Sequence, residues 1–502
     1  MLAIKKELEK ALTKATQLAF PVADQAKVKP KSTLADYECS IPSQVFNNYK
    51  KEQVAFGLFT SREIADAIFV NVEKQKYLQR VEISVTGDLD LYLRDSYLLE
   101  EINSILHNRR IEVAETAPPN HIVTVGPEFG QKPNLFHLRQ LLLCRSLFSC
   151  FEVLNAKVPY TMLCYDVSKP LFEFFSQGNH DPYQLVSNAL QSPTFFQEVK
   201  FQISTELAKL NSLTKAEFRK EFTSDLLNQT IEHQFSENRS EVTMKKFLGS
   251  NYKELELLSK KWPWDWFHII KTFNSSSTSK VIQFCKYYED SNLHKLQKAL
   301  KSFDPGLVSR TQFVKVGDIL SSEGKLTNWP IEQILDSLEN IGHYRTAMCY
   351  EPSYSSKAAL FYYILRRLQV STFHINIDEV FAKSSTSLFG PLAAFNYCNA
   401  NLSQLNLENI QEFKPQDFEN PFVRSFAKET CMFADKLVLC TEDCSLHHLA
   451  EWFENLCKLY MRLERNLNPE VKPKVELLLK IVTEQTLDIF GVDTEKLYRS
   501  NK

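Results

Sequence analysis

The feature that most constrains this fold is a strand–helix–strand succession between residues 121 and 166. His121 to Val125 is an apolar stretch typical of a buried strand, and His137 to Leu154 has helical spacing. Val158 to Asp166 is then predicted to be a second strand. Two strands joined by a helix run parallel in one sheet, because the helix carries the chain back to the edge where the first strand began. This part of the chain is therefore predicted to be an α/β domain.

The first strand and the helix are joined by the segment Lys132-Pro133-Asn134-Leu135-Phe136-His137-Leu138-Arg139. It resembles the adenylate-forming signature of class I aminoacyl-tRNA synthetases, and most closely that of the arginine enzymes. The signature opens a helix, whose unpaired N–H groups and dipole hold phosphate. This copy is one residue shorter and keeps one histidine, His137. Phe136 replaces the glycine beside the nucleotide, and its bulk is expected to block nucleotide binding. The resemblance implies a degenerate site in a chain that is not an enzyme. An ordinary loop-to-helix junction is the alternative.

A second synthetase signature combines a basic loop with a Gly-Asp pair and an apolar passage. Phe313 to Leu320 resembles it, with Gly317 and Asp318 as the pair and Lys315 as the remaining basic residue. The other lysines that embrace the triphosphate in that family have no counterpart. His137 and Lys315 are thus the two remnants that the resemblance assigns to an eroded catalytic site.

The first hundred residues alternate between helical and extended patterns. We predict helices over 1–20, 61–68 (with Ser61 as the cap) and 97–106, and extended segments over 36–40, 81–85 and 90–93. This arrangement predicts a small α+β domain. It resembles the amino-terminal additional domain of arginyl-tRNA synthetases, and the resemblance implies contact with the outer corner of tRNA.

The carboxy-terminal third is predicted to be mainly helical. Ala358 to Arg367 is a predicted helix, and Phe373 to Asp378 alternates as a strand would. Two amphipathic helices follow, with apolar faces over 446–463 and 475–490, and Gly491 ends the second. The region resembles the DALR anticodon-binding domain, whose Gln-Tyr-Ala-His-Ala-Arg-Leu motif corresponds to 396–402. Asn401 stands where that motif has arginine.

Candidate RNA contacts are polar and aromatic residues outside the apolar faces, which we assign to the core. Unstacked anticodon bases suit aromatic stacking and edge hydrogen bonds, and basic side chains hold phosphates. For each one, an ordinary solvated position is the alternative. The tRNA-binding candidates are Tyr397, Asn401, Arg462, Arg465, Lys472, Lys474 and Arg499.

Composition excludes several other classes of protein. With 12 glycines in 502 residues, there is no glycine-rich phosphate loop and no S-adenosylmethionine loop, and no cofactor is predicted. The net charge of −2 confines any RNA contact to a local patch. The 11 cysteines lack paired metal-ligand spacing, so buried thiols are favoured over a zinc site at Cys440, Cys444, His447 and His448. No apolar run is long enough for a membrane span, and a cytoplasmic location is expected.

The predicted fold class is α/β plus all-α, with three domains. Residues 1–115 form the small α+β domain, 119–350 a degenerate class I synthetase Rossmann-like domain, and 354–502 the DALR-type helical bundle. The resemblance implies a non-catalytic tRNA-binding adaptor that recognises arginine tRNAs and presents them to a tRNA 3-methylcytidine methyltransferase. The middle domain would hold the two tRNA-binding parts, the amino-terminal domain and the helical bundle, at a fixed separation.

Two other functions stay open from the sequence. One is a divergent arginyl-tRNA synthetase, with an organellar location as one option, that uses arginine and ATP with His137 and Lys315 as its catalytic groups. The other is a structural scaffold without RNA, which the loss of arginine at Asn401 favours. The sequence leaves open the oligomeric state, the partner-binding surface and the recognised nucleotides.

Overall fold

The protein is described from a computed structural model, in which the chain forms two compact units. Unit 1 comprises Met1–Glu115, Lys383–Asp443 and His448–Asp488, and unit 2 comprises Thr116–Ala382, Cys444–His447 and Ile489–Lys502. The described residues are 1–21, 23–31, 35–52, 60–114, 120–125, 135–156, 160–163, 280–286, 297, 305–320, 356–375, 377–380 and 388–492.

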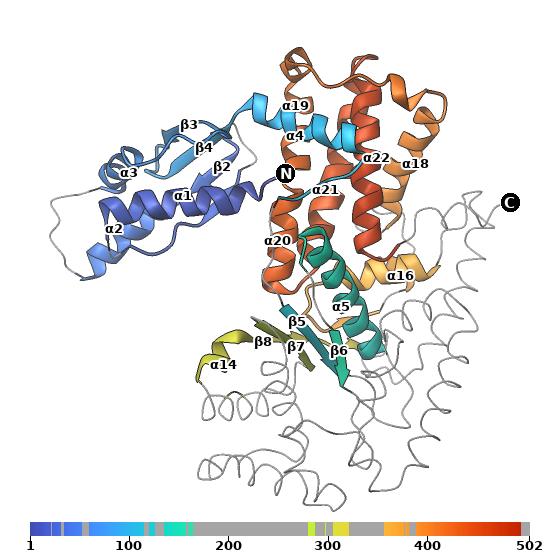
Figure 1. Ribbon diagram of the computed structural model, residues 1–502, viewed down its shortest axis with the longest axis horizontal. Helices are drawn as coiled ribbons and strands as arrows, with labels where there is room; N and C mark the ends of the chain where they lie inside the picture. The colour runs from blue at the N-terminus through green and yellow to red at the C-terminus, as the bar shows by residue number, and fades with distance from the viewer. Residues whose placement is uncertain are drawn as a thin grey trace, which may run out of the picture. The chain divides into compact units, whose positions relative to one another are not determined.

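The first part of unit 1, here called the N module, is an α+β structure (Figure 1). Its four strands form an antiparallel sheet in the order β1-β2-β4-β3, with α1 packed along β1 and α3 against β3. On β4 the apolar side chains alternate inward, so one face of the sheet supplies the core. The elements are α1 (Ile4–Ala19), β1 (Val28–Pro30), β2 (Tyr37–Cys39), α2 (Ile41–Glu52), α3 (Ser61–Phe69), β3 (Leu78–Ile83), β4 (Leu89–Leu93) and α4 (Asp95–Asn108).

Local signals explain most of these boundaries. The cap of α3 is Thr60 rather than the predicted Ser61, because Thr60 and Glu63 form a reciprocal capping box. Gly87 turns the chain between β3 and β4 at φ +84°, and a Cβ there would lie 2.4 Å from the Ser61 hydroxyl. The Ser61 hydroxyl donates to the Thr86 carbonyl oxygen at 3.1 Å, which connects the start of α3 to the β3–β4 turn.

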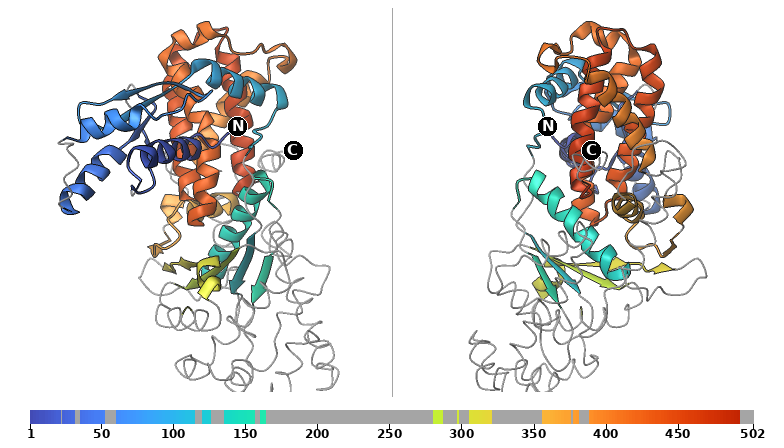
Figure 2. Two further views of the ribbon diagram at one scale, coloured as in Figure 1. Left: turned by 60° about the vertical axis from the view of Figure 1, so that its left-hand side comes forward. Right: turned by 90° about the vertical axis from the view of Figure 1, so that its right-hand side faces the viewer.

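The rest of unit 1 is a helical bundle, drawn in orange and red in Figures 1 and 2. The predicted apolar faces of its last two long helices are buried, which confirms them as core. Gly491 follows the last helix at φ +74°, as predicted for its carboxy-terminal glycine. The helices are α18 (Phe389–Leu402), α19 (Pro421–Cys431), α20 (Phe433–Asp443), α21 (His447–Leu463) and α22 (Lys472–Ile489).

Unit 2 contains the predicted strand–helix–strand succession. β5, α5 and β6 follow one another, and the four strands pair in parallel in the order β6-β5-β7-β8. In Figure 2, α5 lies against this sheet, where it packs on β5. The elements are β5 (Asn120–Val125), α5 (Leu135–Val153), β6 (Tyr160–Leu163), β7 (Lys280–Lys286), α14 (Pro305–Arg310) and β8 (Thr311–Val316).

A two-stranded parallel sheet pairs β9 (Ile319–Leu320) with β10 (Phe373–His374) after α16 (Ser356–Leu365). The prediction of a strand over Phe373 to Asp378 is correct only at its start. Helix α17 (Ile377–Val380) takes over the second half, where Asp378 and Glu379 follow Ile377. Acidic residues favour a helix amino terminus, which explains how the alternation was overridden.

The nine described cysteines are all buried and form no disulfide, which agrees with the prediction of buried thiols. Among the described residues, no cluster of histidine, cysteine or acidic side chains could hold a metal ion. No helix in the described part of the chain is long and apolar enough to cross a bilayer.

Candidate functional site

Helix α5, which carries the end of the synthetase-like signature, follows β5, the strand at the topological switch point of the unit 2 sheet. From β5 the chain passes through α5 to β6 on one side, and β7 pairs on the other side of β5. Open α/β sheets bind ligands beside the carboxyl end of the strand at such a point. Residues 126–134, which follow β5 here and carry the start of the signature, lie outside the described residues.

Arg139, the last residue of the signature, connects it to the second signature. Its guanidinium is buried and donates hydrogen bonds to the carbonyl oxygens of Gly317 (2.7 Å), Ser371 (2.7 Å) and Leu368 (2.8 Å). It also lies over the Phe373 ring at 4.8 Å. Burial lowers the pKa of Arg139 to about 10, although the Asp318 carboxylate opposes this shift. One side chain thus joins α5, the β8–β9 passage and the segment after α16.

The second signature packs tightly against that same segment. The Gly317 N–H donates to the backbone carbonyl oxygen of Gln369 at 2.9 Å, and a Cβ on Gly317 would lie 2.4 Å from the Ser371 carbonyl oxygen. Only glycine permits this approach. Asp318 is buried, and Lys315 on β8 is half-buried. The structure therefore brings the end of the first signature and the Gly-Asp pair together.

Of the two residues predicted to be catalytic, the structure describes the side chain of Lys315 but not that of His137. His137 belongs to the first turn of α5, but its side chain is outside the described ones. Phe136, in the same turn, is 5% exposed. Its predicted obstruction of a nucleotide stays a prediction, because the preceding loop is not described.

Three of the tRNA-binding candidates meet in one polar cluster on unit 1, here called the bundle cluster. The Tyr397 hydroxyl donates to Glu464 at 3.0 Å and accepts from the Lys472 ammonium at 3.3 Å, which also lies 5.2 Å from the Tyr397 ring centre. Asn401 donates to Glu476 at 2.6 Å. Tyr397 is 38% exposed, so part of its ring faces solvent.

Charges within the bundle cluster are partly compensated. Glu476 is buried, which raises the pKa of its carboxyl despite hydrogen bonds from Asn401 and Tyr460. Burial lowers the pKa of Lys472, but the Tyr397 hydroxyl and Glu476 outweigh it, and the net shift is upward. Lys472 therefore keeps its positive charge at neutral pH beside a half-exposed aromatic ring. Such a pair can stack a base and hold its phosphate.

The other candidates that the structure describes are not among the residues that contact Tyr397 or Asn401. Arg462, in the last turn of α21, and Arg465, 84% exposed at its side chain, face solvent. Lys474 is 5% exposed and forms an ion pair with Asp417 at 2.8 Å. Its ammonium is thus directed into the fold in this structure. Arg499 lies outside the described residues.

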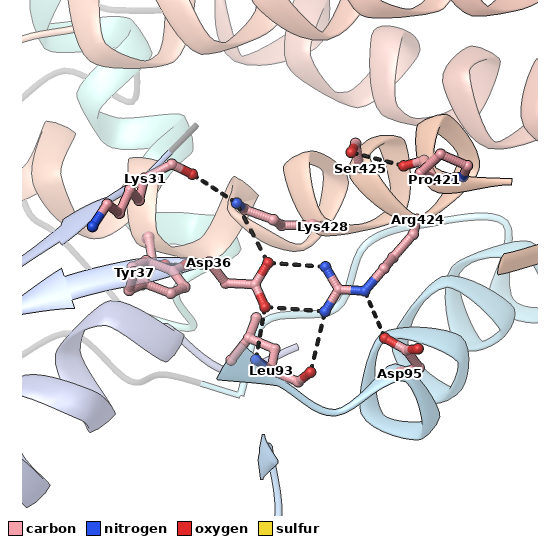
Figure 3. Close-up of polar contacts among 10 residues, drawn as sticks. Lys31, Asp36, Tyr37, Leu93, Asp95, Pro421, Arg424, Ser425 and Lys428 are labelled. Atoms are coloured by element: carbon pink, nitrogen blue, oxygen red, sulfur yellow. Dashed lines mark hydrogen bonds and ion pairs between the residues drawn. The ribbon is translucent and has the colours of Figure 1, made fainter. Parts of the chain in front are cut away.

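The N module joins the bundle through a polar group here called the module lock, which consists of Asp36, Asp95, Arg424 and Lys428 (Figure 3). The buried Asp36 carboxylate accepts two hydrogen bonds from the Arg424 guanidinium, each 3.0 Å long, and lies 3.4 Å from the Lys428 ammonium. On its other side, Arg424 donates to Asp95 at 2.7 Å. Burial raises the pKa of Asp36, but Arg424 and the Leu93 N–H hold it below its usual range.

Three further anchors connect the same two parts of unit 1. Asn103 on α4 exchanges two hydrogen bonds with the Phe413 backbone, at 3.0 and 2.8 Å. The Ile111 backbone exchanges two with the Gln485 amide on α22, at 2.8 and 3.0 Å. The Arg109 guanidinium donates to the Leu407 carbonyl at 2.9 Å. The N module and the bundle are therefore joined at several separated points.

Sequence reasoning gave no structural role to the residues that make the connections in the two units. Arg139 carries a signal, because it is a charged residue in a strongly apolar helix. Asp36 was noted only as the first residue of the extended segment predicted over 36–40. Arg424 and Glu476 carry no local signal, since an isolated charge on an amphipathic helix is ordinarily a solvated one.

Comparisons with known proteins support an arginyl-tRNA synthetase-like chain. The sequence family "Arginyl tRNA synthetase N terminal domain" matches residues 2–93. The cytoplasmic arginine–tRNA ligases of Bos taurus and Mus musculus are each 24% identical over 161 residues, which cover 30% of this chain. The match spans only 23% of the length of these curated relatives.

Solved structures show the same fold over nearly the whole chain. Arginyl-tRNA synthetase from Plasmodium falciparum superposes with a TM-score of 0.68 at 15% identity, covering 98% of this chain and 99% of that one. The Thermus thermophilus enzyme gives 0.66 at 13% identity, with the same coverages. The predicted mixture of α/β and helical parts is confirmed at the level of this fold. The three domain boundaries stay predictions.

These comparisons correct one prediction. We predicted from the altered signature that the chain is not an enzyme, and this is wrong, because its relatives and structural neighbours are arginyl-tRNA synthetases, which are enzymes. The altered signature was overinterpreted.

Proposed function

We propose that this protein binds arginine tRNAs through unit 1, with the helical bundle as a DALR-type anticodon-binding domain. The observation that carries the proposal is the bundle cluster, where the half-exposed Tyr397 ring lies beneath the Lys472 ammonium. Unstacked anticodon bases can stack on such a ring. The exposed Arg462 and Arg465 add phosphate contacts, and the match of residues 2–93 to a synthetase amino-terminal domain supports a second contact at the outer corner.

The finer proposal concerns what happens to the bound tRNA. We propose that the chain presents arginine tRNAs to a tRNA 3-methylcytidine methyltransferase in the cytoplasm. The resemblance of the carboxy-terminal region to DALR-containing proteins supports it. The names of the curated relatives, which place those ligases in the cytoplasm, support the location.

The experiment is a gel shift with purified arginine and non-arginine tRNAs at one stated salt concentration. Selective binding of arginine tRNAs is expected, and equal, weak affinity for all of them contradicts the proposal. Purification of the tagged protein from cells then tests the partner. A methyltransferase that co-purifies, and whose activity on arginine tRNA rises when the chain is added, supports the finer role.

Arginine–tRNA ligation is the second candidate, which the names of the relatives and structural neighbours favour. Arg139 supports it, because it holds the end of the first signature against the Gly-Asp pair. His137 and Lys315 would supply charge stabilisation for adenylate formation. Arginine-dependent ATP–pyrophosphate exchange in the presence of tRNA tests it. Robust exchange establishes ligation, and exchange no faster than in a protein-free control rejects it.

A further inference from the structure

We propose that the N module and the bundle grip one tRNA as a single rigid body, and that the module lock sets the spacing between the two grips. This inference rests on the proposed tRNA binding and adds the device that couples its two contacts. From the sequence, the middle domain was expected to act as the spacer. In the structure, the two parts are joined directly within unit 1.

The geometry of the lock restrains orientation as well as distance. The Arg424 guanidinium donates from its two terminal nitrogens to Asp36 and from its Nε–H to Asp95, and these two carboxylates belong to different parts of the N module (Figure 3). One terminal nitrogen also donates to the Leu93 carbonyl at 3.2 Å. A bidentate pair of this kind tolerates little rotation. Lys428, one helical turn further along α19, also donates to the Lys31 carbonyl at 2.9 Å and so holds the chain leading to β2.

The other contacts between the N module and the bundle restrict the relative rotation that the module lock alone would allow. They attach the N module to α22 through Gln485 and to the segment before α19 through Phe413. A further contact reaches α20, where the Asp435 carboxylate accepts from the Lys5 N–H at 2.8 Å. Several of their partners are backbone groups, which cannot change rotamer. A hinge between two parts requires few contacts at one place, whereas these contacts lie on separate elements.

A fixed spacing has a direct consequence for binding. When two weak grips are held at the separation that the ligand presents, the second contact forms at a high effective concentration. No ordering cost is then incurred for aligning the two parts. Arginine tRNA would therefore bind much more tightly than its isolated anticodon arm.

The first test needs no protein variant. Filter binding compares three RNAs: arginine tRNA, its anticodon hairpin, and arginine tRNA with one base pair added to the anticodon stem. The insertion changes the distance and rotation between outer corner and anticodon. We expect the lengthened tRNA to bind only as well as the hairpin. Affinity close to that of normal tRNA would overturn the rigid coupling, as would a hairpin that binds as tightly as the full tRNA or not at all.

The second test uses Arg424→Lys, which keeps the charge but cannot contact Asp36 and Asp95 together. Affinity for full tRNA is expected to fall by about tenfold or more, and affinity for the hairpin should stay within about twofold. Arg110→Lys is the matched control, because Arg110 is exposed and pairs only loosely with Glu112, 3.8 Å away. Equal effects of Arg424→Lys on both RNAs, or no effect on either, would overturn the inference.

Asp36→Asn separates the two explanations more clearly, because they predict opposite changes in RNA affinity. Removing a negative charge would by itself tighten RNA binding, whereas loosening the lock predicts weaker binding of full tRNA. Failure of the wild-type chain to prefer arginine tRNAs would reject the proposed function. Selective wild-type binding combined with tolerance of the inserted base pair would reject only the coupling.

Discussion

The carboxylate of Asp435 accepts a hydrogen bond from the backbone N–H of Lys5 at 2.8 Å. Lys5 lies in the first turn of α1, where N–H groups have no partner within the helix, and the N-cap residue Ala3 offers no side-chain cap. The Tyr37 hydroxyl donates to the same carboxylate at 3.1 Å. A side chain of the bundle thus caps the first helix of the N module and is buried in doing so.

This buried cap predicts a pH dependence of stability. Burial raises the pKa of Asp435 from 3.8 to about 7, although the Lys5 N–H, the Tyr37 hydroxyl and the charges of Lys5 and Lys436 oppose it. The folded state therefore holds this proton more tightly than the unfolded state. The resulting stabilisation is fully present below about pH 4 and is lost as pH rises through 7, by at most about 4 kcal/mol.

Asp435→Asn should abolish that part of the pH dependence, because asparagine can still accept from Lys5 and does not ionise. Relative to wild type, the variant should gain stability between pH 5 and pH 8. Thermal unfolding followed by circular dichroism at both pH values measures this. Parallel pH profiles for the two proteins would contradict the assignment.

The pH dependence of stability that Asp36 contributes is opposite to that of Asp435. Since its folded pKa lies below the usual range, its contribution to stability is present above about pH 4 and is lost as pH falls. Asp36→Asn should cost about 3 kcal/mol at pH 7, since it breaks a buried ion pair. Asp95→Asn, at a side chain that is 52% exposed, should cost about 1 kcal/mol or less. Urea denaturation compares them, and equal costs would show that burial does not decide the effect.

Arg139→Lys is expected to destabilise unit 2 by about 3 kcal/mol, because an ammonium cannot reach the three carbonyl oxygens that the guanidinium satisfies. Arg310→Lys, at an exposed position on α14, is the matched control. Hydrogen exchange of the β7 and β8 amides reports on this unit. Unchanged protection in Arg139→Lys would mean that the three bonds contribute little.

Tyr397→Ala should weaken binding of arginine tRNA by about tenfold, the usual effect of one lost stacking contact. Tyr397→Phe keeps the ring and should retain most of the affinity. Lys474→Gln provides the contrast, because its ammonium is buried against Asp417 and its loss should lower stability rather than RNA affinity. Fluorescence anisotropy with labelled tRNA separates these cases. A Phe variant as weak as Ala would assign the effect to the hydroxyl network.

Sequence patterns predicted the elements whose local signals are strong. Helix α1, strand β5, helix α5 and the apolar faces of α21 and α22 all follow from periodicity. Helices α2 and α19 were missed, although α19 carries a start signal, because Asn420 caps it and Pro421 occupies its first turn. The alternation from Phe373 to Asp378 predicted a strand throughout. Its second half instead belongs to α17, where acidic residues follow Ile377.

The residues of the bundle cluster could be predicted only in part, because local pattern does not show which side chains a neighbouring helix covers. Tyr397, Asn401 and Lys472 were chosen on motif and position, and the structure brings them into one cluster with Glu464 and Glu476. Lys474 was chosen with them, but an offset of two residues turns its side chain into the fold. Helical position alone separates a surface lysine from a buried one only when the neighbouring helices are known.

Taken alone, the sequence determined the local elements and the family likeness of the amino-terminal region, because both depend on residues close together in the chain. Only the tertiary structure decided that Arg424 pairs with Asp36, 388 residues away, and that Asp435 caps α1. A buried charge is stable only beside its partner. Its place in the fold therefore depends on chain segments that no local pattern brings together.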